Sequence, residues 1–174
     1  MEPSLIFQIQ LVLGYAAWAL CFGAFVWPRL RAMDAVDAIR VVAALHSFRF
    51  LGLLFILPGM VGPGVPAGFS GPAALGDLAT ALLAMIALLA FNVRPVFWVF
   101  AAAFNLVGAV DLGIAYYHAV RLHLPEVSGQ LGSAYLIPIL YVPILALTHG
   151  AAMLLMARLL GADSHAKVAE AIVS

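Results

Sequence analysis

Residues 74–93, ALGDLATALLAMIALLAFNV, and residues 95–119, PVFWVFAAAFNLVGAVDLGIAYYHA, are two long apolar runs joined by Arg94 alone. A helix that crosses a bilayer needs about 20 mostly apolar residues, and each run has that length. The runs are continuous and do not alternate with polar residues, so helices are favoured over the strands of a closed barrel. Because Arg94 and Pro95 predict a tight turn, the two runs predict an antiparallel helical hairpin inside a membrane.

Three further apolar runs extend this pattern to both ends of the chain, at residues 5–27, 41–61 and 133–159. We therefore predict an all-α, polytopic membrane protein with five transmembrane helices that form one domain over residues 1–174. The composition agrees, because 66% of the residues are hydrophobic and only 9% are charged, against about 25% in a soluble domain. The net charge of zero suggests no nucleic acid partner. The expected partners are the lipid bilayer and either a second copy of the chain or a larger membrane complex.

The connections between the spans are short. Residues 29–40 carry charges on one side and an apolar residue at every third position on the other, which predicts a short interfacial helix. Residues 58–72, PGMVGPGVPAGFSGP, hold four prolines and five glycines and predict an irregular loop. Residues 120–132 predict a polar loop before the fifth span.

Lysines and arginines in the connections set the predicted orientation. Only Arg121 falls on one side of the membrane, and six fall on the other: Arg29, Arg31, Arg40, Arg94, Arg158 and Lys167. The side with more positive charge stays in the cytoplasm. We therefore expect the N-terminus outside, the C-terminus in the cytoplasm, and a multi-pass protein of a bacterial inner membrane.

Ionisable residues inside the spans are costly and mark candidate functional positions. Asp77 and Asp111 each lie 17 residues from Arg94, which puts both about 25 Å from the cytoplasmic turn. The two carboxylates are therefore expected to meet in the outer half of the membrane, where one of them would keep a proton. Because Asp77 follows Gly76 near the predicted start of its helix, a helix cap is the alternative role for it.

His46, Arg49 and His149 are expected at a second, inner level. Arg49 and His149 lie about 13 Å, and His46 about 9 Å, from the cytoplasmic side. His46 and Arg49 are three residues apart and share one helix face. Arg49 needs an anionic partner, and a pair with Asp77 or Asp111 is the simplest structural solution.

Two more polar residues complete the candidate set. Asn105 lies with Ala101 and Gly108 on a narrow face of small residues, which lets helices approach closely and form polar contacts. His118 lies seven residues beyond Asp111 on the same face, so this stripe predicts either a wet path to the outer surface or a helix contact. The third span has a matching face of small residues at every fourth position: Gly76, Thr80 and Ala84.

These residues leave four functions open. In the first, the buried cluster binds a small, lipidic or quinone-like ligand or handles protons. Asp111 would carry the proton, Asp77 would share it, and three residues would hold the head of the ligand: His46, Arg49 and His149. In the second, His46 and His149 ligate one haem, as in a b-type cytochrome or a membrane anchor. In the third, the chain is a membrane enzyme that acts on a lipid or isoprenoid, with the paired carboxylates and a histidine as general acid and base. The fourth function is that of a structural or assembly subunit, and the sequence does not decide whether the chain is an enzyme.

The haem alternative also has a parallel in topology. A five-span chain with its N-terminus outside and histidines on spans two and five resembles the membrane anchors of respiratory nitrate reductases. Those anchors carry two histidines on each of these helices, whereas His46 and His149 stand alone here, so the resemblance implies no second haem. Cys21 is the only cysteine, which leaves neither a disulfide framework nor a cysteine-based zinc site.

Overall fold

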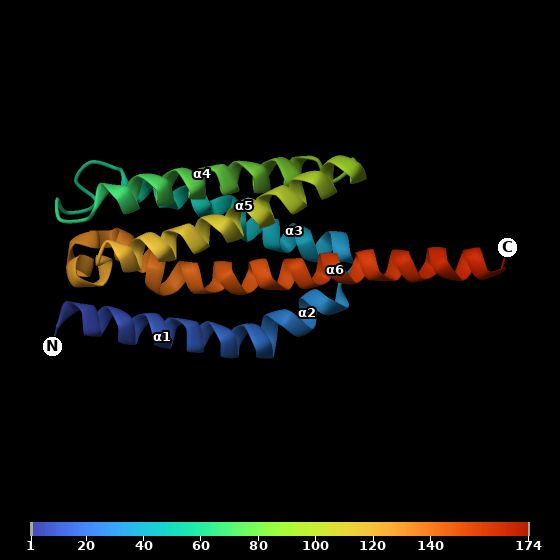
Figure 1. Ribbon diagram of the computed structural model, residues 1–174, viewed down its shortest axis with the longest axis horizontal. Coiled ribbons are helices and arrows are strands. Elements are labelled where there is room, and N and C mark those ends of the chain that lie inside the picture. Colours follow the sequence, from blue (N-terminus) through green and yellow to red (C-terminus); the bar gives the residue numbers. More distant parts are fainter. Residues whose placement is uncertain (1, 174) are drawn as a thin grey trace.

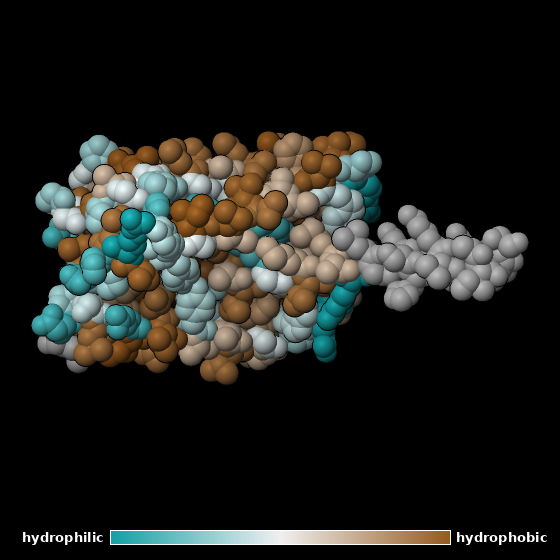
Figure 2. Space-filling view, in the orientation of Figure 1, coloured by the Kyte–Doolittle hydropathy of each residue, from teal (hydrophilic) through white to brown (hydrophobic). Residues whose placement is uncertain are grey.

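The computed structural model describes residues 2–173, with side chains as far as Leu159, and this part of the chain is helical and has no strand. Five stretches are long and apolar enough to cross a membrane, which confirms the predicted number: Pro3–Ala32, Ala35–Phe55, Ala67–Leu89, Arg94–Arg121 and Ile137–Leu159. They run along one axis, with the N-terminus at one end of the bundle and the C-terminus beyond the other (Figure 1). Hydrophobic residues cover much of the flank, and hydrophilic residues gather mainly toward the two ends (Figure 2).

The first stretch consists of two helices joined by a π-helical turn: α1 (Pro3–Cys21), η1 (Phe22–Val26) and α2 (Trp27–Ala32). The predicted interfacial helix over residues 29–40 is wrong, because α2 ends at Ala32 and α3 (Ala35–His46) already belongs to the second stretch. Asp34 causes the break, since its carboxylate accepts a hydrogen bond from the Val36 N–H at 3.0 Å and caps α3. Three apolar residues of this segment are buried in the bundle, Leu30, Val36 and Ile39, whereas Met33 is exposed.

The second stretch changes its winding halfway. At Ser47, α3 passes into η2 (Ser47–Phe55), a 3₁₀-helix, in which residues three apart lie on the same side. Arg49, Gly52 and Phe55 therefore share one side, and all three are buried. Runs of 3₁₀-helix of this length are uncommon, and this one turns Arg49 and Gly52 together toward the third stretch.

The third and fourth stretches form the predicted antiparallel hairpin. It consists of α4 (Ala67–Leu89) and α5 (Arg94–Arg121), and α4 also packs along η2. Because α4 begins earlier than predicted, the loop covers residues 56–66 and the predicted loop residues 67–72 belong to the helix. Asp77 consequently lies well inside α4, so the alternative role of a helix cap is wrong.

The chain beyond α5 is more regular than the predicted polar loop. It forms 3₁₀ turns, a π-helical turn and a long helix: η3 (Leu124–Tyr135), η4 (Ile137–Tyr141) and α6 (Val142–Val173). Gln130 ties the loop 56–66 to η3, because its carbonyl accepts a hydrogen bond from the Gly62 N–H and its Oε1 accepts one from the Gly64 N–H, each at 2.7 Å. These two segments close the end of the bundle at which the N-terminus lies.

Two apolar clusters fill the interior. The cluster near the N-terminal end includes Phe7, Phe69, Ala74 and Leu124. The cluster toward the opposite end includes Ile39, Ala84, Phe97 and Phe104. Along α4, Asp77 lies between Ala74 of the first cluster and Ala84 of the second, so the buried polar residues occupy the junction of the two clusters.

Candidate functional site

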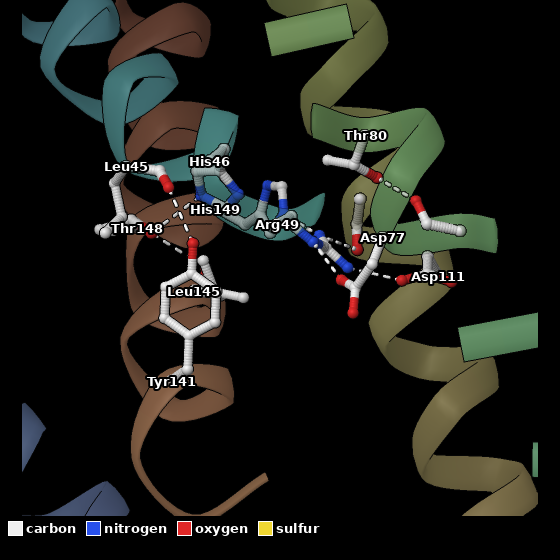
Figure 3. Close-up of polar contacts among 12 residues, drawn as sticks. Leu45, His46, Arg49, Asp77, Thr80, Asp111, Tyr141, Leu145, Thr148 and His149 are labelled. Carbon is white, nitrogen blue, oxygen red and sulfur yellow. Dashed lines mark hydrogen bonds and ion pairs between the residues drawn. The ribbon is translucent and has the colours of Figure 1, made fainter. Parts of the chain in front are cut away.

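One fully buried arginine links four helical segments. Arg49 of η2 is 0% exposed. Its Nε donates to Asp77 Oδ1 of α4 at 2.6 Å, and its Nη2 donates to Asp111 Oδ2 of α5 at 2.5 Å. Its Nη1 donates to the Gly108 carbonyl at 3.2 Å and to His149 Nε2 of α6 at 3.1 Å (Figure 3). A buried charge is tolerated when it is paired and hydrogen-bonded, and here every nitrogen of the guanidinium is bonded.

Three glycines make the space for these side chains. A Cβ added to Gly52 would overlap the Asp77 carboxylate, and one added to Gly76 would overlap the Asp111 carboxylate. A Cβ at Gly108 would lie 2.5 Å from the nearest imidazole nitrogen and 2.6 Å from the guanidinium. Contacts this short force atoms to move. The ion pairs therefore depend on the missing side chain at each of the three positions.

The hydrogen-bond partners of His149 assign it a neutral ring. Asn105 Nδ2 donates to the Ala101 carbonyl at 3.1 Å, and Asn105 Oδ1 lies 3.0 Å from His149 Nδ1 as an acceptor. His149 Nδ1 therefore carries the proton, and its Nε2 accepts the N–H of Arg49. Because the imidazole is neutral in this pattern, the positive charge of the site belongs to Arg49.

His46 packs beside His149, with the ring centroids 4.0 Å apart. The Thr148 hydroxyl donates to the Ile144 carbonyl at 2.8 Å, so it accepts from His46 Nε2 at 3.0 Å. Within the described side chains, His46 Nδ1 has no hydrogen-bond partner. His46 and His149 are 0% and 2% exposed, so the histidine side of Arg49 is closed and densely packed.

This arrangement does not favour the haem alternative. An axial pair of histidines needs the flat macrocycle between its rings, whereas the centroids of His46 and His149 are only 4.0 Å apart. Both Nε2 atoms are already hydrogen-bonded, one to Thr148 and the other to Arg49. No group of three or more His, Cys, Asp or Glu side chains in the described part of the chain is placed to hold a metal ion. The haem assignment stays a prediction.

A cavity of about 190 Å³ lies on the other side of the ion pairs. Asp77 and Asp111 line its polar end and are each 8% exposed. Most of the remaining wall is apolar and comes from seven helical elements, with Phe7, Leu11, Phe55, Phe69, Ala115 and Ile137 as examples. Tyr116 also lines the cavity, and its hydroxyl is hydrogen-bonded to the Tyr15 hydroxyl of α1. The lining residues do not include His46, Arg49 or His149.

Each carboxylate keeps one oxygen that no protein donor uses. Arg49 bonds to Oδ1 of Asp77 and to Oδ2 of Asp111. No donor in the described residues reaches Asp77 Oδ2 or Asp111 Oδ1 within hydrogen-bond distance. With one guanidinium against two carboxylates, full ionisation leaves one net negative charge at this end of the cavity. The site therefore has a net charge of zero only when it takes up one additional positive charge.

The structure brings together six of the seven residues that the sequence singles out: His46, Arg49, Asp77, Asn105, Asp111 and His149. Asp77 and Asp111 meet at Arg49, as their equal distance from Arg94 along the chain predicts. His118 lies apart, half-buried on α5, and takes no part in this network. Of the predicted stripe, Asp111 and Ala115 line the cavity, whose wall is mostly apolar, and the wet path stays a prediction.

Three features escaped the sequence analysis. The role of Gly52 could have been predicted, because Gly52 follows Arg49 by three residues and therefore shares its helix face. Thr148 had no such signal, since its bond to His46 joins helices that are far apart in the sequence. The cavity had none either, because its wall is assembled from seven helical elements that are spread along the chain.

Over the described residues, fold and site together define a small helical bundle with five helices long and apolar enough to cross a membrane and a buried Arg–Asp–Asp cluster beside a cavity. Residues 6–157 match the family described as Domain of unknown function (DUF8737), and the chain belongs to this family. The match covers every residue of the cluster, from His46 to His149. No curated protein and no solved structure matches the chain.

Proposed function

We propose that the chain binds a small lipidic or quinone-like molecule in the cavity, and that the Asp77–Asp111 pair handles a proton there. The observation that carries this proposal is an apolar cavity of about 190 Å³ that ends on two carboxylates. Pockets for drug-sized ligands usually measure about 300–1,000 Å³. This cavity is smaller, so it suits a short molecule, or the head and first part of a longer chain.

Charge balance supports proton handling. Arg49 neutralises one carboxylate, and the second is costly to bury as an anion. A proton on one of the pair removes this cost, and its release would follow the arrival of another positive charge. Asp111 is the proposed carrier and Asp77 the residue that shares the proton. His149 and Asn105 then hold Arg49 in place and do not touch the ligand.

The closed end of the bundle supports a ligand that arrives through the membrane. The loop 56–66 and η3 cover the cavity on the side of the N-terminus, with Val65, Leu124 and Leu131 buried there. Laterally, α1 packs mainly on η3, η4 and α6, and towards α5 it is tied by the Tyr15–Tyr116 hydrogen bond. A lipid-soluble molecule would therefore enter between α1 and α5.

The charges at the two ends support an orientation with the N-terminus outside and the C-terminus in the cytoplasm of a bacterial inner membrane. The end opposite the N-terminus carries five arginines at the described positions, against Arg121 at the N-terminal end: Arg29, Arg31, Arg40, Arg94 and Arg158. Such an excess stays in the cytoplasm. In a Cys21→Ser background, Gly129→Cys should react with a membrane-impermeant thiol reagent on intact cells, and Asn92→Cys should react only after lysis. The reverse pattern would invert the orientation.

An apolar carbodiimide tests the proposed site directly. Dicyclohexylcarbodiimide takes the proton of a carboxylic acid on its nitrogen, the carboxylate oxygen adds to its central carbon, and an oxygen-to-nitrogen acyl shift leaves a stable N-acylurea without a leaving group. We expect an adduct on Asp77 or Asp111 in the protein purified in mild detergent, located by peptide mass spectrometry. Labelling should rise as the pH falls, because only the protonated acid reacts.

Asp111→Asn and Asp77→Asn remove the proposed targets one at a time, and Asp37→Asn is their matched control. Asp37 is an exposed carboxylate in an ion pair with Arg40, and its replacement should leave the buried adduct unchanged. Filling the cavity with Ala115→Leu should suppress labelling, whereas Ala102→Leu, on the exposed face of the same helix, should not. Absence of any adduct on Asp77 and Asp111 across the pH range would refute the proposal.

A structural role is the second candidate, and a specific observation favours it. Every nitrogen of Arg49 is satisfied by acceptors of the protein itself, which is also what a purely structural cluster would show. In that case the carboxylates stay paired and unreactive, so the carbodiimide experiment separates the two candidates.

A further inference from the structure

The polar end of the cavity restricts the head group of the ligand, and this inference rests on the binding function proposed above. All three nitrogens of the Arg49 guanidinium donate to the protein itself, in four hydrogen bonds to Asp77, Asp111, Gly108 and His149. The guanidinium is also absent from the lining residues of the cavity. A head group that enters the cavity therefore meets no cationic side chain.

What the head group does meet is two carboxylates. Asp77 and Asp111 are more than nine-tenths buried, line the cavity, and each has one oxygen without a donor among the described residues. The other polar lining side chains, Gln8 and Tyr116, carry no charge at neutral pH. An anionic head would find no free cation to pair with in an apolar surrounding, and it would face like charge once both carboxylates are ionised, which is strongly unfavourable.

The charge count leads to one class of ligand. One guanidinium and two carboxylates carry a net negative charge that a single cation cancels, and an ammonium group adds hydrogen-bond donors for the two unused carboxylate oxygens. The apolar wall of the cavity then suits an alkyl chain attached to that head. We propose that the cavity selects amphiphilic amines, which bind as ammonium ions in exchange for the proton of the Asp77–Asp111 pair.

The exchange is balanced in charge and atoms. In the empty site one carboxylic acid holds the proton, and the site is neutral with Arg49. When an alkylammonium ion binds, that proton leaves to the solvent and the ammonium takes over its charge. Binding therefore releases one proton for each amine, and it weakens as the pH falls, because the proton competes with the amine for the same carboxylates.

Three probes with the same eight-carbon chain and different heads test this selectivity: octylamine, octanol and octanoate. Binding to the purified full chain in a neutral detergent would be followed by native mass spectrometry and by the shift in thermal unfolding midpoint. We expect octylamine to bind at least about tenfold more tightly than octanoate, with octanol between them. A pH indicator in weak buffer should record the released proton with octylamine alone.

Two pairs of variants separate the site from partitioning into detergent. Asp111→Asn should bring the amine-to-octanoate ratio of affinities close to one and abolish proton release, whereas Asp37→Asn should keep both. Ala115→Leu should lower binding of octylamine by about tenfold or more, and Ala102→Leu should leave it unchanged. If Asp111→Asn does not fold, Asp77→Asn and the alanine pair still provide the test.

The outcomes distinguish the two levels of the proposal. If octanol or octanoate binds as tightly as octylamine in an Ala115-dependent way, the cavity is a ligand site but the inferred class of ligand is wrong. If octylamine binds without proton release, the exchange is wrong. If no probe binds in a way that Ala115→Leu weakens, the cavity is not a ligand site and the proposed binding function fails with the inference.

Discussion

The two sides of the Arg49 guanidinium have different surroundings. On one side, His149 and Asn105 form a chain of hydrogen bonds that ends on a backbone carbonyl, and aromatic and aliphatic side chains fill the remaining space. On the other side, Asp77 and Asp111 each use one oxygen for Arg49 and border a cavity of about 190 Å³. Arg49 is thus held in position by neutral groups on the histidine side, whereas the two carboxylates on the cavity side carry more negative charge than it neutralises.

This difference indicates that the histidine and the carboxylates of the cluster have different roles. A neutral, fully buried histidine gives the guanidinium a fixed position without adding charge. The carboxylates supply the two groups whose charge is not balanced inside the protein. Changes on the histidine side should therefore act on stability, and changes on the carboxylate side should act on ligand and proton binding as well.

The largest effect is expected from Arg49→Leu. This change leaves two buried carboxylates without their cation, and breaking a buried ion pair costs about 3–5 kcal/mol. Unfolding by sodium dodecyl sulfate in mixed micelles, followed by circular dichroism, measures the loss. The triple variant with Asp77→Asn and Asp111→Asn should recover part of it, because no unpaired charge remains. Equal stability of wild type and Arg49→Leu would contradict the central role of this residue.

The second effect concerns the space that a glycine provides. A Cβ at Gly76 would overlap the Asp111 carboxylate, so Gly76→Ala should lower the free energy of unfolding by about 1–3 kcal/mol and also weaken octylamine binding. Gly113→Ala is the matched control on α5, since a Cβ there meets nothing within 4 Å. That control should be neutral or slightly stabilising. If Gly76→Ala left the free energy of unfolding unchanged, the close packing at this position would be dispensable.

The third effect sharpens the comparison between the two sides. His149→Leu leaves Asn105 Oδ1 without its donor and removes one acceptor of Arg49. An unsatisfied buried polar group costs about 1–3 kcal/mol, so stability should fall by this amount. The ratio of octylamine to octanoate affinity should remain within about twofold of wild type, because His149 does not border the cavity. If His149→Leu abolished the preference for octylamine over octanoate, the ligand would bind on the histidine side.

The smallest effect is expected at the surface. Asp37 and Arg40 form an exposed ion pair at 2.8 Å, and such pairs contribute about 0–1 kcal/mol. Asp37→Asn should therefore change the free energy of unfolding by less than about 0.5 kcal/mol and leave ligand binding unaltered. A larger change would mean that the end of α3 matters more to the fold than its exposure implies.

The sequence by itself determined the five apolar spans and the set of residues that had to be buried together. Length and hydropathy are sufficient for the spans, because backbone groups in lipid must bond within one helix. Burial follows from cost, since an arginine or aspartate inside a span needs a polar partner. The equal spacing of Asp77 and Asp111 from Arg94 even gave their common depth, because the rise of a helix is constant.

The tertiary structure alone decided how these residues divide their roles. The 3₁₀ winding of η2 turns Arg49 and Gly52 together toward α4. The local sequence pattern does not predict this change from α-helix to 3₁₀-helix. Neither the neutral form of His149 nor the separation of His118 from the cluster follows from spacing along one helix. The cavity is shaped by side chains of seven helical elements, and contacts between distant segments depend on packing that a linear pattern does not contain.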